Sequence, residues 1–515
     1  MMKQLIIVFI SLLLSANCVL AQSEMLASSR LHLPALRSVS MLPSRKVLAK
    51  TDFDGLAADP NVFAVPIETD LNPCNSGEWE SADGVRVWRL ALCSPNAFSL
   101  NATLSDFYIP ADAELSIYGT GSSRQVTTLS AEQNADVLPL PPVEGDMLVF
   151  EYVEPLDAEF QGMFNIVQVA HDFKGVFAAA DGTDAECHIG IDSDFGVDWQ
   201  NEQRAVCQII IGGTALCTGT LLASADGSCE PYVLTARHCV HTQKMAETCV
   251  FYFKNDDALN VPAVVGATLV ATKDNDDGFL DFSLLKLSER PDGLGVYYAG
   301  WDASGEVPSG AVCIHHPASG GKLIAVDNDS LRVASYRNFD ENSFFNVEEW
   351  DVGTTEIGSS GAPIFDSNHR VVGILAGGDA DCAYPMNDYF QMFSICYDRY
   401  ANESQQLKRW LNPNDTNVVK IDGRYPQPSV ISDKKVGPTL SVYPNPAKNE
   451  IEISCGNQLI TSVTIVDLQG RQMLRLNIGW KPMVRVDVSE LPFGVYVCRV
   501  TFENGESDNA MIIKE

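Results

Sequence analysis

Three short motifs, in the order histidine, aspartate, serine, contain the residues needed for nucleophilic catalysis. The first is the apolar run Val233–Cys239, which ends in a small-residue turn with His238. The second sets Asp281 at the head of a further apolar run, and the third sets Ser360 in the turn Ile357–Phe365. A serine hydroxyl has too high a pKa to attack unaided, so it needs a neutral imidazole to take its proton and a carboxylate to orient that imidazole. The motifs therefore predict a catalytic triad.

The glycines beside Ser360 suggest a second role for the same turn. Glycine lets the backbone approach a substrate closely and adopt dihedral angles that other residues avoid. The backbone N–H groups of Gly358 and Ser360 could then form an oxyanion hole, which stabilises the negative oxygen of a tetrahedral intermediate. Because Gly/Ser turns are common in all-β proteins, this prediction depends on the two upstream motifs.

The composition narrows the class of protein and of partner. The chain of 515 residues is long enough for about three domains, and its 46% of apolar residues is typical of a soluble globular protein. The net charge of -32 at pH 7 argues against phosphate backbones and anionic membranes, because both reward lysine and arginine. Nucleic acid is therefore not an expected partner.

The first residues have the layout of a secretory signal. Residues 1–21 carry a lysine near the start, an apolar run and Val19-Leu20-Ala21 before Gln22. A lipoprotein signal at Cys18 is the weaker alternative, because Asn17 stands where a small residue is expected. No later apolar run is long enough to span a bilayer. The mature chain is therefore expected to leave the cytoplasm.

Cysteine and histidine spacing indicates disulfides rather than a metal centre. Removal of Cys18 with the signal leaves 13 of the 14 cysteines, and an exported chain normally pairs most of them. No CxxC or HExxH occurs, and the adjacent His315 and His316 would point to opposite faces of a strand. We expect no metal, no other cofactor, and one cysteine without a partner.

Alternating apolar residues between turn signals predict an all-β protein. After the signal, residues 22–184 are interpreted as a β-rich pro-region that ends in a small, acidic segment suited to cleavage. Residues 185–424 continue with strands spaced for a barrel or sandwich. Residues 425–437 read as a linker, and residues 438–515 form a separate small β-sandwich.

The motifs TARHC, DFSLL and GSSGAP, in this order, resemble those of the chymotrypsin-like serine peptidases. Within residues 185–424 the resemblance narrows to the lysyl endopeptidases, a family of secreted bacterial proteases. It implies a double β-barrel, with His238 as base, Asp281 as its partner and Ser360 as nucleophile. The further segments that carry it are ECHI at 186–189, RAV at 204–206, CTGTL at 217–221, AGWD at 299–302, IHHP at 314–317, and GG at 377–378 followed by Cys382.

The resemblance also implies particular disulfides. Cys217 would pair with Cys239, as in the superfamily, and so brace the histidine loop. Cys187 would pair with Cys382, as in the family. Two further pairings are guesses from local position, Cys74 with Cys93 in the pro-region and Cys455 with Cys498 in the last domain.

Lysine on the acyl side of the scissile bond is the expected specificity. A cationic substrate side chain in a pocket needs a paired negative charge. The position six residues before the nucleophile, acidic in trypsin, is Thr354 here, but Asp388 matches the specificity aspartate of the lysyl endopeptidases. The alternative is that Asp388 is simply a turn residue. Two positions depart from the family, since Ala376 and Tyr336 stand where a histidine and a tryptophan are typical.

Activation is expected to differ from that of trypsin-like zymogens. In those, an aspartate before the nucleophile captures the new N-terminus, but Ser359 stands at that position here. We expect the pro-region to assist folding and to block the cleft, with release after Lys174 or within the acidic segment that follows.

The last domain resembles the C-terminal sorting domain of type IX secretion. The resemblance is carried by YPNP at 443–446, LPFGVY at 491–496 and the terminal IKE. It implies export across the outer membrane, to the cell surface or the medium, with the type IX machinery as a partner. A generic adhesion-like β-sandwich is the alternative.

Together these features predict a secreted serine endopeptidase that hydrolyses proteins or peptides through an acyl-enzyme and cleaves after lysine. One alternative is a serine endopeptidase of another specificity. A second is a surface adhesin on a degenerate protease scaffold. The presence of all three triad residues argues against the adhesin.

Overall fold

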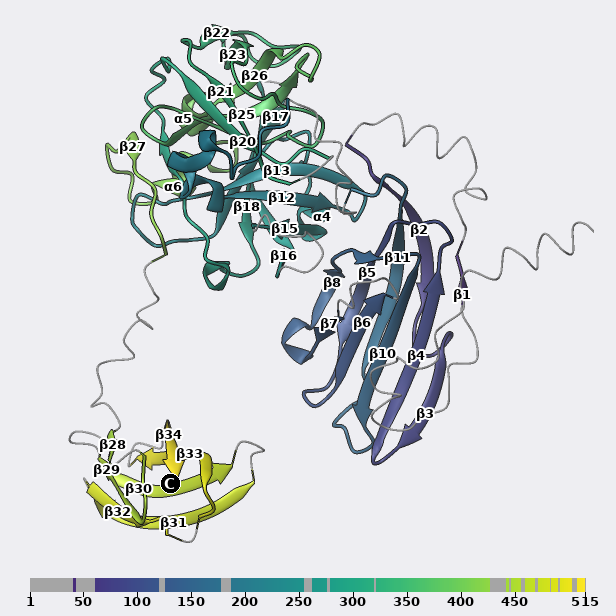
Figure 1. The fold of residues 1–515 in the computed structure, drawn as a ribbon, viewed down its shortest axis with the longest axis vertical. Helices are drawn as coiled ribbons and strands as arrows, with labels where there is room; N and C mark the ends of the chain where they lie inside the picture. The colour runs from purple at the N-terminus through teal and green to yellow at the C-terminus, as the bar shows by residue number, and fades with distance from the viewer. Residues whose placement is uncertain are drawn as a thin grey trace, which may run out of the picture. The chain divides into compact units, whose positions relative to one another are not determined.

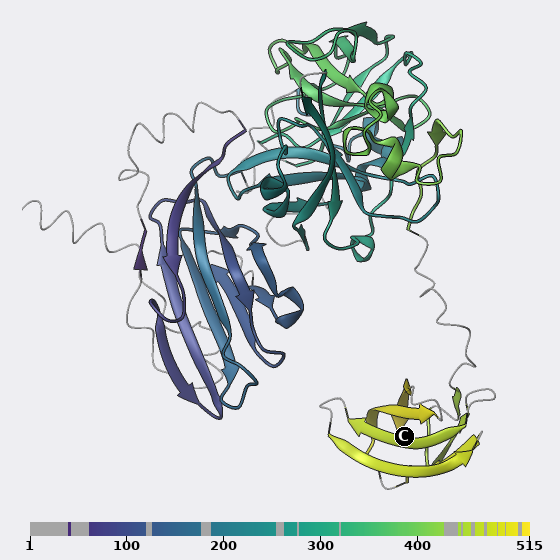
Figure 2. The same ribbon diagram turned by 180° about the vertical axis from the view of Figure 1, so that it is seen from behind.

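The structure, a computed structural model, describes residues 40–42, 61–119, 126–176, 187–253, 262–275, 278–318, 321–426, 441–443, 446–454, 459–467, 471–481, 483–489, 491–502 and 507–514. The predicted signal peptide, the cleavage segment after Val176 and most of the predicted linker lie outside these residues, as does Cys455. The chain divides into two compact units, Met1–Pro426 and Gln427–Glu515 (Figure 1; Figure 2 gives the view from behind). Strands dominate both units, which confirms the all-β prediction.

The first unit begins with two β-sheets that face each other across one core. One sheet has the order β1-β4-β10-β6-β7 with β3 beside β4, and the other has the order β2-β11-β5-β8 with β9 beside β5. Trp88, Leu100, Phe150 and Phe164, from both sheets, lie in one apolar cluster whose burial stabilises the sandwich. The strands are β1 (Ser40–Met41), β2 (Ala64–Leu71), β3 (Glu78–Ala82), β4 (Val85–Cys93), β5 (Ser99–Tyr108), β6 (Glu114–Gly119), β7 (Val126–Leu129), β8 (Ala135–Pro139), β9 (Val143–Glu144), β10 (Met147–Pro155) and β11 (Met163–Asp172).

A seven-stranded sheet follows, with the order β16-β15-β12-β13-β14-β18-β17. Ile209, Val233, Phe251 and Leu285 come from four of its strands and share one apolar cluster, as in a sheet curled around its own core. The strands are β12 (Val206–Ile211), β13 (Ala215–Leu222), β14 (Tyr232–Thr235), β15 (Cys249–Tyr252), β16 (Val264–Val265), β17 (Ala267–Asn275) and β18 (Gly278–Leu287).

A nine-stranded sheet forms the second barrel, with the order β21-β20-β24-β25-β26-β23-β22 and with β19 between β25 and β27. Cys313, Ile364, Val372 and Phe390 contribute to its core. The two curled sheets are the double barrel that the resemblance implied. The strands are β19 (Gly300–Asp302), β20 (Ala311–His315), β21 (Leu323–Asp327), β22 (Arg332–Ala334), β23 (Phe344–Glu349), β24 (Pro363–Phe365), β25 (Arg370–Gly378), β26 (Met386–Met392) and β27 (Lys420–Ile421).

The helices of the first unit are short connections. The α-helices are α4 (Gln243–Glu247), α5 (Phe393–Asp398) and α6 (Lys408–Leu411). The 3-10 helices are η1 (Ala131–Gln133), η2 (Asp194–Trp199), η3 (Glu202–Arg204), η4 (Asp292–Leu294) and η5 (Glu403–Gln405).

The two barrels share an apolar cluster that includes Leu234 and Phe282 of the first sheet and Ile314 and Phe365 of the second. Trp301 on β19 is fully buried in this cluster, and its indole N–H donates to the carbonyl of Ala223 at 2.8 Å. This bond links the second barrel to the end of β13 in the first. Trp301 therefore helps to fix the two barrels relative to each other.

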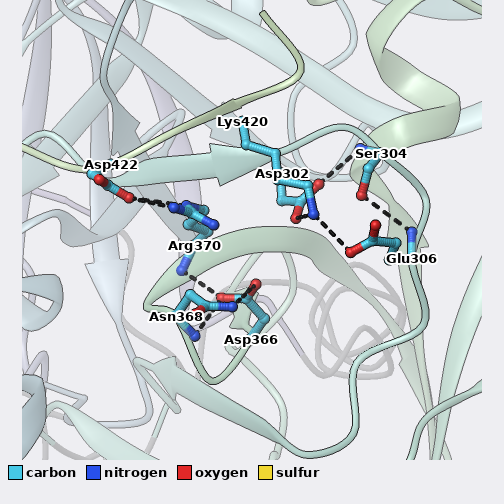
Figure 3. Close-up of polar contacts among 8 residues, drawn as sticks. All are labelled: Asp302, Ser304, Glu306, Asp366, Asn368, Arg370, Lys420 and Asp422. Atoms are coloured by element: carbon cyan, nitrogen blue, oxygen red, sulfur yellow. Dashed lines mark hydrogen bonds and ion pairs between the residues drawn. The ribbon is translucent and has the colours of Figure 1, made fainter.

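Ion pairs surround β27 at the end of the second barrel (Figure 3). Arg370 Nη2 lies 2.7 Å from Asp422, and Lys420 Nζ lies 2.9 Å from Asp302. Because Lys420 and Asp422 reach solvent, each of these ion pairs contributes little individually, and the backbone pairing of β27 with β19 is the larger constraint. The chain up to Asp422 therefore belongs to this barrel.

The second unit contains two small sheets, with the orders β28-β29-β32 and β31-β30-β33-β34. Ile451 and Val486 of the first sheet share a core with Val463 and Val500 of the second, as predicted for a small β-sandwich. The strands are β28 (Ser441–Tyr443), β29 (Glu450–Ser454), β30 (Ile460–Asp467), β31 (Gln472–Lys481), β32 (Met483–Asp487), β33 (Gly494–Phe502) and β34 (Ser507–Lys514). In the part of the chain that the structure describes, no helix is both long enough and apolar enough to cross a bilayer.

The cysteines correct one expectation. The expectation that most cysteines pair is wrong for the described residues, and Cys74, proposed as a partner of Cys93, has a free thiol. Burial raises the pKa of Cys207 to about 12, so this thiol stays protonated and acts as a small apolar side chain. The other buried free cysteines are Cys229, Cys249, Cys313, Cys396 and Cys498.

We expect Trp301→Ala to lower the free energy of unfolding of the first unit by about 3 to 5 kcal/mol, because it leaves a cavity and an unpaired carbonyl. Trp410→Ala is the matched control, since it removes the same side chain from a partly exposed site. Denaturant titration followed by circular dichroism measures both. Equal losses in the two variants would contradict the role given to Trp301.

Candidate active site

His238 and Asp281 are joined by two contacts. Nδ1 of His238 lies 2.8 Å from Oδ2 of Asp281, and the backbone N–H of His238 donates to Oδ1 at 2.9 Å. One carboxylate thus orients both the imidazole ring and the loop that carries it. Because Nδ1 faces Asp281, Nε2 is the nitrogen that would take a proton in the predicted role of base.

Asp281 lies between the two barrels. It belongs to β18 and is 1% exposed, and its backbone N–H donates at 2.9 Å to the side-chain oxygen of Gln391, on β26 of the second sheet. The His238 side chain, by contrast, is 35% exposed. The carboxylate is therefore shielded from water while the ring stays accessible to a substrate.

A disulfide braces the histidine loop. Cys217 in β13 is bonded to Cys239, with their Cα atoms 6.3 Å apart, which confirms the predicted pair. Because Cys239 directly follows His238, the bond ties this loop to the wall of the first barrel. The loop cannot move away from Asp281 without moving the strand.

The turn that carries Ser360 approaches the histidine strand closely. The backbone N–H of Thr218 donates to the carbonyl of Ser360 at 2.8 Å. Gly361 has φ +84°, and a Cβ there would lie 2.3 Å from the carbonyl oxygen of Thr218 and 2.9 Å from the nitrogen of Ala236. Only glycine fits this approach. The turn that carries Ser360, on the second barrel, therefore meets the first barrel two residues before His238.

The predicted oxyanion turn is held by neutral contacts. Gly358 has φ +94°, where glycine is favoured, and a Cβ there would lie 2.5 Å from the nitrogen of Ala318. Ser359 Oγ accepts a bond from the N–H of Glu356 at 3.2 Å and lies 2.7 Å from Nδ1 of His315. Burial lowers the pKa of His315 to about 3, so the imidazole is uncharged. The turn is therefore held without an ion pair at Ser359.

Asp388 lies buried on β26, directly opposite Gly378 of β25, and is 2% exposed. Its Oδ2 accepts a bond from Thr355 Oγ1 at 2.5 Å and one from Trp350 Nε1 at 2.8 Å. A Cβ at Gly378 would lie 2.3 Å from Oδ1 of Asp388. Burial raises the pKa of this carboxyl to about 6, despite the two bonds. Asp388 is therefore a desolvated acid held in one orientation, rather than a turn residue at the surface.

The two departures from the family lie close to this acid in the fold. Tyr336 stacks on Tyr389, the residue after Asp388, with ring centroids 4.4 Å apart. Ala376 is 6% exposed on β25, next to Gly377, where a Cβ would lie 3.2 Å from the hydroxyl of Tyr336. Tyr336 therefore packs along the strands that carry the acid.

A second predicted disulfide, Cys187 with Cys382, is also present, with Cα atoms 5.5 Å apart. Nearby, His188 Nε2 lies 3.0 Å from a carboxylate oxygen of Glu356. The four side chains place their ligand atoms within 4.8 Å of one another, a spacing that would suit a metal ion. Because both sulfurs are used in the disulfide, neither is a thiolate ligand. The group instead ties residues 187–188 to Glu356, which directly precedes the predicted oxyanion turn.

Several supporting residues escaped the sequence analysis. Trp350 and Gln391 hold the two acids Asp388 and Asp281, and nothing in their local sequence marks either of them. Thr355 stands five residues before Ser360, the predicted nucleophile, and a polar residue at that spacing is a signal that could have identified it.

Comparison with known proteins gives matches to two family models and to curated proteins that include a lysyl endopeptidase. Residues 181–391 match the lysyl endopeptidase C-terminal domain, and residues 441–514 match the secretion system C-terminal sorting domain. A lysyl endopeptidase from Pseudomonas aeruginosa is 26% identical over 364 residues, which span 63% of this chain and 76% of the relative.

Solved structures similar to the chain include two proteases. The active form of the Rv3671c protease from M. tuberculosis shows 15% identity and a TM-score of 0.27, over 38% of this chain and 78% of that structure. A Glu endopeptidase shows 19% identity and a TM-score of 0.27, over 37% of this chain and 85% of that structure.

The matches to family models and to the relative place the protein among the serine endopeptidases, with its protease domain similar to the lysyl endopeptidases. The sorting domain indicates type IX secretion to the cell surface or the exterior.

We expect Gly361→Ala to lower the stability of the first unit and to abolish peptide hydrolysis, because the added methyl group would meet the backbone of Thr218 and Ala236. Gly295→Ala controls for backbone strain alone, since Gly295 has φ +71° and the nearest atom to a Cβ there is 3.8 Å away. Thermal unfolding and peptide hydrolysis measure both variants. Equal losses of stability and activity in the two variants would show that backbone strain, and not the contact between the barrels, causes them.

Proposed function

We propose that residues 185–424 hydrolyse peptide bonds after lysine, with His238, Asp281 and Ser360 as the catalytic triad. Residues 22–184 are then the pro-region, residues 425–437 the linker and residues 438–515 the sorting domain. The substrates are proteins or peptides encountered outside the cell.

Acylation follows from the roles given to the triad. Ser360 Oγ attacks the carbonyl carbon of the scissile bond while Nε2 of His238 takes the hydroxyl proton. The carbonyl oxygen becomes an oxyanion, which the N–H groups of Gly358 and Ser360 stabilise. The C–N bond then breaks, His238 gives the proton to the leaving amine, and an ester remains on Ser360.

Deacylation repeats these steps with water as the nucleophile. His238 takes a proton from the water as the oxygen attacks the ester carbonyl. The bond to Ser360 Oγ breaks, and the proton returns to the serine while the acid product leaves. Asp281 keeps the ring oriented through both steps and stabilises the imidazolium form of His238.

The observation that supports the triad most strongly is the double contact of Asp281 with His238, one to the ring and one to the backbone. A buried carboxylate placed only for stability would not need to orient a ring that is left accessible to solvent. Gly361 also lies close to Ala236, so the turn that carries Ser360 lies beside the loop that carries His238.

The proposal of lysine specificity rests on Asp388. Its carboxylate is already removed from water and oriented by Thr355 and Trp350. A lysine ammonium that enters the pocket meets a single buried negative charge, which compensates for the hydration that the ammonium loses. An uncharged side chain leaves that carboxylate unpaired, so lysine is favoured over an apolar side chain of the same length.

We expect Ser360→Ala to lower kcat by roughly 10⁴- to 10⁶-fold while the fold is kept, because the nucleophile is lost. Hydrolysis of a lysine peptide and labelling by a fluorophosphonate probe measure the effect, with circular dichroism as the check on folding. Ser404→Ala, at an exposed serine of the same domain, should be unchanged. A variant Ser360→Ala that keeps the wild-type rate would refute the triad, and a wild-type protein that takes no label would favour the adhesin.

The preference for lysine should weaken at acid pH. Because burial raises the pKa of Asp388 to about 6, the carboxyl is ionised above this pH and neutral below it. Two peptides that differ only in lysine or norleucine are compared by their ratio of kcat/KM, from which the titration of the triad cancels. We expect the ratio to fall by about tenfold between pH 8 and pH 5.

Asp388→Asn should abolish most of this preference and its pH dependence, whereas Asp379→Asn, at an exposed neighbour, should keep both. A wild-type ratio near one at pH 8 would overturn lysine specificity. A strong preference in Asp388→Asn would assign the pocket acid to another residue.

A further inference from the structure

The two-sheet sandwich of β1–β11, here called the N-terminal domain, contacts the candidate active site through residues 61–64. The backbone N–H of Gly358 donates at 3.2 Å to Oδ1 of Asn61. This N–H is one of the two donors proposed for the oxyanion of the substrate. A carboxamide oxygen matches a peptide carbonyl oxygen in size and in hydrogen-bonding capacity. Asn61 therefore occupies a donor that the scissile carbonyl would use.

Backbone pairing fixes the position of Asn61. The N–H of Leu216 donates to the carbonyl of Asn61 at 3.0 Å, and the N–H of Phe63 donates to the carbonyl of Thr214 at 2.8 Å. Val62 and Ala215 form an antiparallel bridge between these two bonds. The segment thus adds to the start of β13, in the way that an extended peptide adds to a sheet edge. The same strand contains Cys217, which is bonded to the histidine loop.

Side chains strengthen this docking. Asn101 Nδ2 donates to the carbonyl of Gly213 at 2.9 Å, and Gln168 Nε2 donates to that of Gly212 at 2.8 Å. An apolar cluster joins the two domains beside the pairing. It comprises Phe63, Ala64 and Ala170 of the N-terminal domain with Ile210, Leu216, Val250 and Tyr252 of the first barrel.

The oxyanion turn is already formed while Asn61 is bound. Gly358 has its positive φ, and Ser359 is held by His315. Thr218 Oγ1 donates to the carbonyl of Gly358 at 3.1 Å, which anchors the turn to the first barrel, and the N–H of Gly358 points away from the turn toward Asn61. None of these contacts involves a new N-terminus, so cleavage of the chain is not needed to build the turn.

We propose that the N-terminal domain keeps the uncleaved chain inactive by occupancy: the carboxamide of Asn61 fills a preformed oxyanion hole and imitates a substrate carbonyl. The inference rests on the function proposed above. The uncleaved chain is then inactive because one side chain occupies the oxyanion hole, and not because the turn that forms the hole is deformed. Removal of the domain frees the hole without a rearrangement of the turn.

The test uses the full-length chain and a small fluorophosphonate probe, whose reaction with Ser360 needs the oxyanion hole but no extended substrate contacts. Intact and processed chains are resolved on a denaturing gel, and the labelling rate of each band is measured. In wild type, the processed band should label at least about tenfold faster than the intact band. In Asn61→Ala, the intact band should label at a rate close to that of the processed band.

Two further variants sharpen the result. Asn75→Ala removes an exposed asparagine from the same domain and should label like wild type. Asn61→Asp places an anionic oxygen against the same N–H and should label the intact chain more slowly than wild type. Its processed band, which lacks residue 61, should label at the wild-type rate, and this excludes misfolding as the cause.

The outcomes separate the two proposals. An unlabelled processed band in wild type would contradict the proposed function itself. A labelled processed band together with an intact Asn61→Ala band as slow as wild type would overturn the occupancy proposal alone. Equal acceleration in Asn75→Ala and Asn61→Ala would also overturn it, because the effect would then reflect general loosening of the domain.

Discussion

The approach of Gly361 to Thr218 and Ala236 is the constraint on which the rest of the protease domain depends. The predicted base belongs to one barrel and the predicted nucleophile to the other, so the two sheets must meet within van der Waals distance at one point. A side chain at Gly361 would separate them. The shared core around Trp301 and the bond from Asp281 to Gln391 hold the barrels in the relation that this contact requires. The disulfide holds the histidine loop in place within the first barrel.

Burial shifts the pKa values of two residues in opposite directions on the two sides of the proposed site. On the side of the oxyanion turn, burial leaves His315 neutral, so the turn is held by contacts that change little with pH. On the side of the pocket, burial makes Asp388 harder to ionise, while Thr355 and Trp350 oppose that effect by hydrogen bonding to the charged form. The residues that hold the predicted oxyanion turn are therefore separate from Asp388, the titrating residue proposed to recognise lysine.

Local sequence predicted the parts of the structure that depend on local pattern. The all-β class, the double barrel and the pair Cys217 with Cys239 follow from alternation, motif order and resemblance, and each is present. The contacts of Asn61, Trp350 and Gln391 join segments far apart in the chain, and no periodicity encodes which distant strand a side chain will face. The expectation that most cysteines pair was wrong because a thiol in a tightly packed core is also a good apolar residue.

The bond between Cys187 and Cys382 closes a loop of 195 residues that contains His238, Asp281 and Ser360. Closing so long a loop stabilises the folded chain by roughly 5 kcal/mol in the chain-entropy view. The disulfide also changes the consequence of a single proteolytic cut in the chain. A protease working beside other copies of itself is exposed to cleavage in its own surface loops, and one cut anywhere between these two cysteines leaves the two pieces covalently joined. Outside the cell the enzyme cannot be replaced by new synthesis. The disulfide therefore lets a copy that has been cut once by another copy stay in one covalently linked piece.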